Sequence, residues 1–111
     1  MLLKLSLAAI LLAAAPALSA LAADTPSFTL TIRNHRFEPA ELQVPAAQKI
    51  ELLVINQDST PEEFESKDLH REKVVPGGQR ATITLGPLKP GTYTFFGEFN
   101  PKTAQGRIIV R

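Results

Sequence analysis

The sequence predicts an all-β protein, folded as an antiparallel β-sandwich of about seven to eight strands in a single domain. Two observations support this class. The segments after the first 22 residues are short, and apolar residues in them alternate with polar ones, which is typical of strands with one buried face. Turn residues also recur at intervals of about 8–12 positions, as in a small sandwich.

Residues 1–22 are predicted to be a cleaved signal peptide. Lys4 precedes an apolar run, and residues 20–22 have the small-x-small pattern of a cleavage site. Pro16 interrupts the run, which is shorter than the ~20 residues that a membrane span needs. The domain is therefore expected at 23–111, periplasmic and without stable membrane insertion after cleavage; a retained N-terminal anchor is the alternative.

The predicted strands lie, in order, at 27–33, 36–44, 48–56, 71–75, 80–86, 92–96 and 106–110. In the first strand the three apolar residues fall on one face. In the second, Pro39 kinks the chain before a short strand. The segment 48–56 is more continuously apolar, so we expect it in the centre of a sheet.

The later strands are bounded by turn signals. The strand at 71–75 stops at the turn residues 76–78, and the strand at 80–86 alternates again with its apolar residues inward. Tyr93 follows a Pro-Gly-Thr sequence, which predicts a tyrosine corner that locks a Greek-key crossover. The strand at 106–110 completes the set.

The segment 56–72 departs from this pattern because it is long and acidic. We expect it to be a loop with a single helical turn near residues 66–69. Loops of this length in small domains are usually functional or disordered. Phe64 and Leu69 lie within the segment, so we expect the loop to pack on the sandwich. A solvated loop of mixed charge is the alternative.

Composition excludes several function classes. The chain has 12 Lys and Arg and 11 Asp and Glu, so loss of Lys4 leaves equal numbers, and nucleic-acid binding is not indicated. The absence of cysteine excludes disulfides, thiolate metal sites and thiol nucleophiles. The two histidines form no persuasive Ser-His-Asp arrangement, and no phosphate-binding loop is present.

The sequence GTYTFFGEFNPKTAQGRIIV at 91–110 resembles the closing hairpin of the cupredoxins, the small blue-copper β-sandwich proteins. In that family the last loop carries Cys, His and Met, and a first His follows an Asn-ended strand, which is ELLVIN ending at Asn56 here. The resemblance covers Phe28 to Val110. It implies a cupredoxin-like Greek-key sandwich.

The copper ligands of that family are not present at the matching positions. Gly97 stands at the Cys position, Asn100 at the second His, about Gln105 at the Met, and Glu62 or Glu63 at the first His. A type 1 blue-copper centre needs two His, one Cys and a weak axial ligand. A blue-copper electron carrier is therefore excluded.

Hard and borderline ligands are found instead. In an extended chain, residues two apart share a face, which would bring together the pair in GluPheGlu and the pair in HisArgGlu. If the sandwich is cupredoxin-like, the earlier and the closing loops meet at one end, so their carboxylates would approach each other. Such ligands suit Cu(II), Fe and Mn(II) better than Cu(I). The candidate metal ligands are Glu63, Glu65, His70, Glu72 and Glu98.

Each candidate also has a simpler interpretation. Glu98 could form a salt bridge with Arg71 or Lys73. His70 could be an exposed loop histidine. Glu63 could bond only the backbone. The sequence leaves these alternatives open.

Four stretches, PEEFES, LHREKVVPGG, GPLKPGTYTFFGEF and TAQGRIIV, are similar to one branch of the fold: the Cys-free cupredoxin-like domain of EfeO-type periplasmic iron-uptake proteins. The resemblance implies a protein that binds copper(II) or iron and helps to deliver iron to a permease or other uptake proteins. It also implies possible help in ferrous iron oxidation, without assigning an enzyme activity to the domain alone. The alternative function is a metal-free interaction module.

Overall fold

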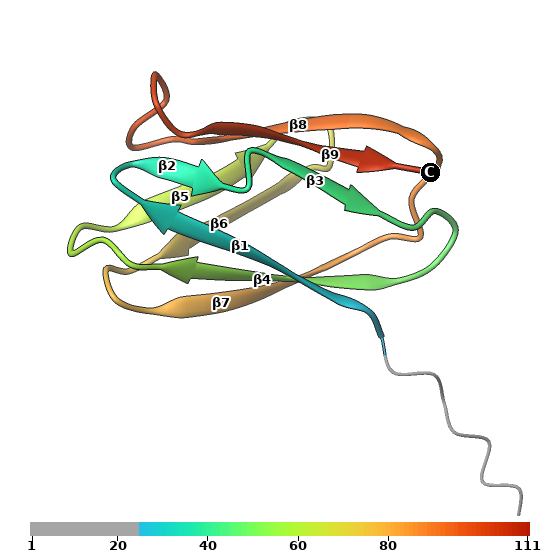
Figure 1. The fold of residues 1–111 in the computed structure, drawn as a ribbon, viewed down its shortest axis with the longest axis horizontal. Helices are drawn as coiled ribbons and strands as arrows, with labels where there is room; N and C mark the ends of the chain where they lie inside the picture. Colours follow the sequence, from blue (N-terminus) through green and yellow to red (C-terminus); the bar gives the residue numbers. More distant parts are fainter. Residues whose placement is uncertain (1–24) are drawn as a thin grey trace, which may run out of the picture.

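The computed structural model describes residues 25–111, which form two β-sheets packed face to face (Figure 1). The four-stranded sheet has the order β2-β1-β4-β7, and the five-stranded sheet has the order β3-β9-β8-β5-β6. The strands are β1 (Ser27–Arg33), β2 (Arg36–Glu38), β3 (Glu41–Val44), β4 (Ile50–Asn56), β5 (Glu62–Ser66), β6 (Arg71–Val75), β7 (Arg80–Leu85), β8 (Gly91–Gly97) and β9 (Gln105–Val110). The described part of the chain is thus all-β, as predicted.

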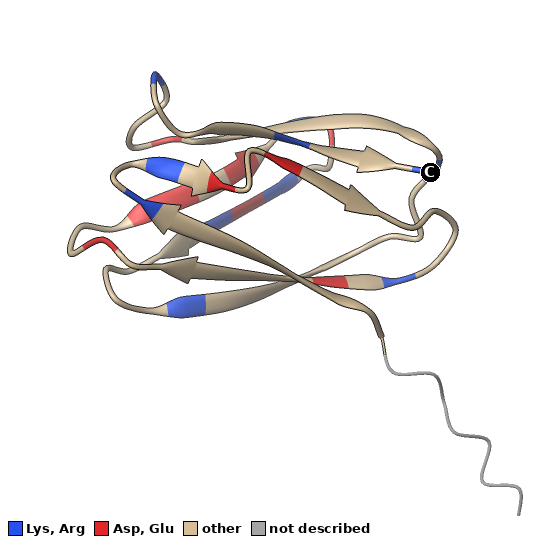
Figure 2. Ribbon diagram, in the orientation of Figure 1, with Lys and Arg blue, Asp and Glu red and all other residues tan. Residues whose placement is uncertain are grey.

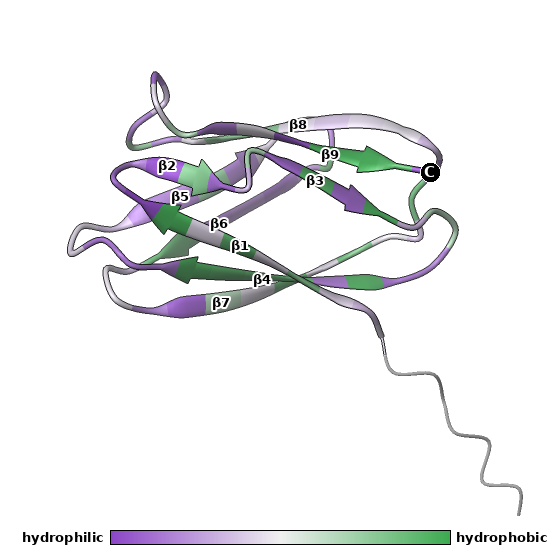
Figure 3. Cartoon of the chain, viewed as in Figure 1, coloured by the Kyte–Doolittle hydropathy of each residue, from purple (hydrophilic) through white to green (hydrophobic). Residues whose placement is uncertain are grey.

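The core lies between the sheets and is built from the inward residue of each strand. In β4 every second side chain is buried, and the strand is hydrogen-bonded between β1 and β7, as its continuous apolar sequence predicted. Figure 3 shows apolar stretches along β1, β4 and β9, whereas β6 is polar over most of its length. The sheet containing β5 and β6 therefore has an outer face on which charged residues can lie.

Three phenylalanines fill the core beneath β5 and β8. The ring of Phe95 lies 5.1 Å from that of Phe37, nearly perpendicular to it, and 5.1 Å from that of Phe64. Such aromatic contacts contribute beyond the area that they bury. They hold β2, β5 and β8 in fixed positions relative to one another.

The predicted strand at 36–44 is two strands in different sheets. β2 pairs with β1, whereas β3 pairs in parallel with β9 in the other sheet. Pro39 lies between them and has no N–H to donate to a ladder, so the first pairing ends there. β1 and β4 are also parallel, so each sheet combines parallel and antiparallel pairs.

The prediction of a loop over 56–72 is wrong, because this segment contains β5. Glu62, Phe64 and Ser66 point inward in alternation, but only Phe64 is apolar, so the period of a strand was hidden. The expected helical turn is also wrong. The chain turns between β5 and β6 with the His70 N–H donating to the Lys67 carbonyl (3.2 Å).

The predicted signal peptide, residues 1–22, lies outside the described residues. Over 25–111, the structure has no helix with the length and apolar character needed to span a membrane.

The crossover from β7 to β8 is fixed by the predicted tyrosine corner. The Tyr93 hydroxyl donates to the Lys89 carbonyl at 2.8 Å. Tyr93 also packs against the core with its ring half-buried. This bond connects the strand of the five-stranded sheet to the turn that leaves the other sheet.

Replacing Tyr93 with Phe removes this hydrogen bond and keeps the ring. We expect the free energy of unfolding to fall by about 1 kcal/mol, the usual contribution of one such bond. Urea denaturation followed by circular dichroism measures the change. An unchanged midpoint and slope would show that the corner does not contribute to stability.

Candidate metal centre

The alternation of β5 directs two carboxylates to the outer face of the five-stranded sheet. Because Glu62, Phe64 and Ser66 are buried, Glu63 and Glu65 point away from the core. Antiparallel pairing places Glu72 of β6 directly opposite Glu65, on the same face. Figure 2 shows acidic residues gathered on β5 and continuing onto β6.

Four carboxyl groups meet on this face, and we call Glu63, Glu65, Glu72 and Glu98 the acidic cluster. One carboxylate oxygen from each of the first three lies within 4.8 Å of the others. Glu98 follows β8, its N–H donates to the Glu63 carbonyl (3.0 Å), and its carboxyl lies within hydrogen-bonding reach of Glu65. The structure thus brings Glu63 and Glu98 together, as expected, but on the sheet face and not between end loops.

The neighbouring carboxyl groups raise the affinity of Glu63 and Glu65 for protons. The pKa of Glu63 is raised above its ordinary value, first by its half-buried position and then by the charges of Glu72 and Glu98. The pKa of Glu65 is raised by partial burial and then by Glu98. Both causes disfavour the charged forms of Glu63 and Glu65.

No basic side chain neutralises the acidic cluster within residues 25–111. The ion pairs of this part of the chain are Arg33–Glu38, His35–Asp58 and Arg107–Glu41, all elsewhere. The alternative in which Glu98 pairs with Arg71 or Lys73 is therefore not what the structure shows. The cluster is anionic and available to a cation.

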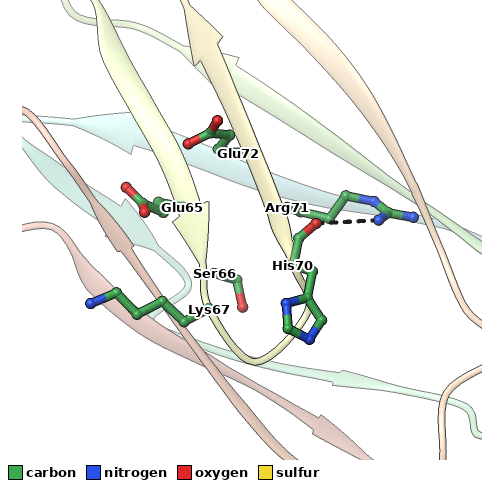
Figure 4. A pocket seen from close by; sticks show the side chains of 6 residues that line it. All are labelled: Glu65, Ser66, Lys67, His70, Arg71 and Glu72. Carbon is green, nitrogen blue, oxygen red and sulfur yellow. Dashed lines mark hydrogen bonds between the residues drawn. The ribbon is translucent and has the colours of Figure 1, made fainter.

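The structure does not bring His70 into the cluster. His70 lies at the end of the turn, where its φ is 53°, so the chain is not extended there and the expected shared face with Glu72 is lost. It is exposed and lines an open cavity of about 270 Å³, with its ring directed away from Glu65 and Glu72 (Figure 4). The groups that lie together are all carboxylates.

Hydrogen bonds from buried or turn residues fix the hairpin that carries the cluster. Asn56 donates to the carbonyls of Thr60 and Val75, at 2.9 and 3.0 Å, and so sets the entry into β5. Ser66 donates to the Thr94 carbonyl at 2.7 Å. Asp68 accepts from the N–H and hydroxyl of Thr94, and these bonds lower its pKa. Together they hold β5 and β6 against β8.

The position that the resemblance gave to the cysteine has no space for a side chain. A Cβ on Gly97 would lie 2.6 Å from Cδ and 2.7 Å from Oε1 of Glu62, and 2.6 Å from Cβ of Ala104. Of the two candidates for the first-His position, Glu62 is the one that lies here, while Glu63 faces outward. Ala104 is fully buried beside Gly97, and Gln105 is exposed.

Hydrogen bonds hold the Glu62 carboxylate between β5 and the closing loop. Its Oε1 accepts from the N–H of Phe99 (2.9 Å) and of Glu63 (3.1 Å), and its Oε2 accepts from Nδ2 of Asn100 (2.6 Å). With no thiolate, imidazole or free space, the residues present do not fit a type 1 copper centre. This role cannot be read from the sequence, because a Glu in an acidic segment is ordinarily expected at the surface.

Comparison with known proteins gives one family. The model of the family described as "Cupredoxin-like domain" matches residues 4–110. The uncharacterized protein RP394 of Rickettsia prowazekii (strain Madrid E) is 53% identical over 81 residues, which cover 73% of this chain and 65% of that protein. The chain thus spans less than two thirds of this relative's length.

Among solved structures, the chain is similar to auracyanin A, a "blue" copper protein of Chloroflexus aurantiacus, with a TM-score of 0.67 and 13% identity over 77% of this chain and 98% of that one. It is also similar to a purple cupredoxin from Nitrosopumilus maritimus, with a TM-score of 0.59 and 19% identity over 75% and 98% of the two chains. At these identities the likeness shows the fold alone.

Replacing Gly97 with Ala places a methyl group against Glu62 and Ala104. We expect the free energy of unfolding to fall by about 1–3 kcal/mol, the usual range for an overpacked core. Urea denaturation measures the loss. A variant as stable as the parent would show that the Glu62 side chain moves aside freely.

Replacing Glu65 with Gln should stabilise the metal-free protein near pH 7. Because the folded-state pKa values of Glu63 and Glu65 are raised above 4.5, the folded protein holds these protons more tightly than the unfolded chain. Stability from this source is therefore complete below about pH 4.5 and is lost as the pH rises through the folded-state values. Removing one charge reduces that loss. Urea unfolding from pH 4 to 7.5 follows it.

The matched control is Glu51→Gln, on β4 in the other sheet. It should leave the pH profile unchanged, whereas the gain in the Glu65 variant should disappear toward pH 4, where the carboxyls are protonated in both states. Equal profiles for the two variants would contradict the repulsion within the cluster.

Proposed function

The chain belongs to the cupredoxin-like domain family, and on that premise we propose that it is a periplasmic cation-binding accessory protein of iron uptake, with iron as its cargo. The observation that carries this proposal is the convergence of Glu63, Glu65 and Glu72 within 4.8 Å, with Glu98 beside them and no basic partner among residues 25–111. A bound cation would offset the repulsion that raises the pKa of Glu63 and Glu65.

The donor set determines the class of cation. All of the grouped ligands are carboxylate oxygens, and His70 lies apart. Hard oxygen ligands suit Fe(III) and Mn(II), and carboxylates also bind Cu(II), whereas Cu(I) prefers sulfur. The site is therefore expected to bind Fe(III) or Cu(II) in preference to Cu(I).

The assignment to iron uptake rests on the resemblance to the EfeO-type branch, carried by PEEFES and LHREKVVPGG. These two stretches contain all of β5 and β6 and therefore three of the four clustered carboxylates. Hard carboxylate ligands favour Fe(III) over Fe(II), so a ferrous ion that gives its electron to an external acceptor such as dioxygen would be held as Fe(III) before delivery to a permease. Export by the predicted signal peptide at 1–22 would place the protein in the compartment where this cargo arrives.

A second candidate is a metal-free interaction module, favoured by the apolar surface near the closing loop. Phe99 is 48% exposed, and a cavity beside it is lined by His35, Asn100, Pro101, Lys102 and Thr103. An exposed aromatic residue in a loop is a common contact for a protein partner. This candidate predicts no cation affinity at the acidic cluster.

Titration of the purified protein with Mn(II), Fe(III) and Cu(II) separates the two candidates. We expect one-to-one binding that Glu65→Gln and Glu98→Gln each weaken by more than about tenfold, because outer-shell changes alone have effects of 10–100-fold. Since the pKa values of Glu63 and Glu65 are raised, binding should release protons and strengthen as the pH rises from 5 to 7. Isothermal calorimetry in two buffers of different ionisation enthalpy measures both effects.

The control is again Glu51→Gln, which preserves the acidic cluster and should bind as the parent does. The metal function would be overturned if the parent protein bound no cation, or if the Glu65 and Glu98 variants bound it as tightly as the parent does. In that case, the interaction module becomes the better account of the fold.

A further inference from the structure

Glu62 is a buried carboxylate that the proposed cation site does not use. It is 1% exposed and lies on the opposite face of β5 from the acidic cluster. Burying a charged group is costly unless hydrogen bonds replace its water. Here three N–H groups donate to its two carboxyl oxygens, so both oxygens have partners in the interior.

The donors to Glu62 come from two segments that are distant in sequence. Glu63 belongs to β5, whereas Phe99 and Asn100 belong to the closing loop between β8 and β9. Because hydrogen bonds to an ionised acceptor are roughly twice as strong as neutral ones, the carboxylate joins the two segments firmly. Side-chain donation from Asn100 is required by chemistry, since a carboxylate can only accept.

Asn100 in turn organises the closing loop. Its N–H donates to the Gly97 carbonyl at 3.1 Å, and its carbonyl accepts from the N–H of Thr103 at 3.2 Å and of Ala104 at 2.9 Å. Glu98 lies between Gly97 and Phe99 in the chain. Gly97 packs against the Glu62 side chain, and the Phe99 N–H donates to the Glu62 carboxylate. Glu62 therefore restrains the backbone at Phe99 directly, whereas Gly97 is held by the pairing of β8 with β5.

We propose that Glu62 is a positioning residue: its buried carboxylate orders the closing loop and so sets Glu98 in place beside Glu63 and Glu65. The cation-affinity part of this proposal rests on the proposed function. The loop-ordering part stands on the hydrogen bonds alone.

The test reverses the polarity of the Glu62–Asn100 hydrogen bond. Asn100→Asp sets two carboxylates against each other and should increase the hydrogen-exchange rate of the Phe99 amide about tenfold or more. It should also weaken Mn(II) binding by about tenfold or more. In the double variant Glu62→Gln/Asn100→Asp, the amide of residue 62 can donate to the new carboxylate, so both values should return toward those of the parent.

The control Gln57→Glu adds one negative charge to an exposed residue of the loop that precedes β5 and should change neither value. Unchanged exchange and affinity in Asn100→Asp, or a double variant no better than the single one, would overturn the proposal. If Asn100→Asp does not fold, folding of the double variant with parental exchange supports it. If neither variant folds, the single variant Glu62→Gln is measured instead. Faster exchange of the Phe99 amide and weaker Mn(II) binding support the proposal, and parental values overturn it.

Failure of the proposed function gives a different result. If the parent protein binds no Mn(II), the cation-positioning role falls together with the metal site. The exchange rates of the Phe99 amide still decide whether Glu62 orders the loop. The Mn(II) titration and the exchange measurement therefore distinguish the two failures.

Discussion

The alternation of one short strand determines most of what is distinctive in this protein. β5 directs Glu62, Phe64 and Ser66 into the sandwich and Glu63 and Glu65 out of it. A shift of one residue would exchange these sets, so that Phe64 would be exposed and Glu63 and Glu65 would be buried. The register is held by the Phe64 contact with Phe95 and by the bond from Ser66 to the Thr94 carbonyl. One packing constraint thus separates a structural carboxylate from those that face solvent.

The sequence was sufficient for the fold wherever the inward residues were apolar. The positions of β1 and β7 could be predicted from period-two patterns, that of β4 from its continuous apolar run, and the tyrosine corner from its turn residues. β5 could not, because two of its three inward residues are polar and reveal their burial only through partners elsewhere in the chain. Pro39 was recognised as a kink, but a kink alone does not tell which sheet the chain enters next.

The candidate site, too, could be predicted only in part from the sequence. Spacing correctly gave Glu63 and Glu65 a common face, and the resemblance pointed to Glu98. The geometry around Glu72 arises from strand pairing with Glu65, which the sequence does not specify. His70 does not share a face with Glu72, as an extended chain would require, because its positive φ belongs to a turn. The interior role of Glu62 depends on register, hydrogen-bond partners and the lack of a side chain at Gly97, all of which are properties of the folded state.

The interior and the outer face of this sandwich follow opposite rules. Within residues 25–111 no buried side-chain nitrogen or oxygen lacks a hydrogen-bond partner, so even the charge of Glu62 is compensated. On the outer face, the carboxylates of the acidic cluster stand together without an ion pair, and their proximity raises the pKa of Glu63 and Glu65. A surface that only needed solubility would intersperse the two signs of charge. Because any ion that binds only the folded state stabilises it, a cation at this face would offset a repulsion that the rest of the structure maintains. Stability and binding are then linked through the same carboxylates, while Glu62 holds the loop that completes the group.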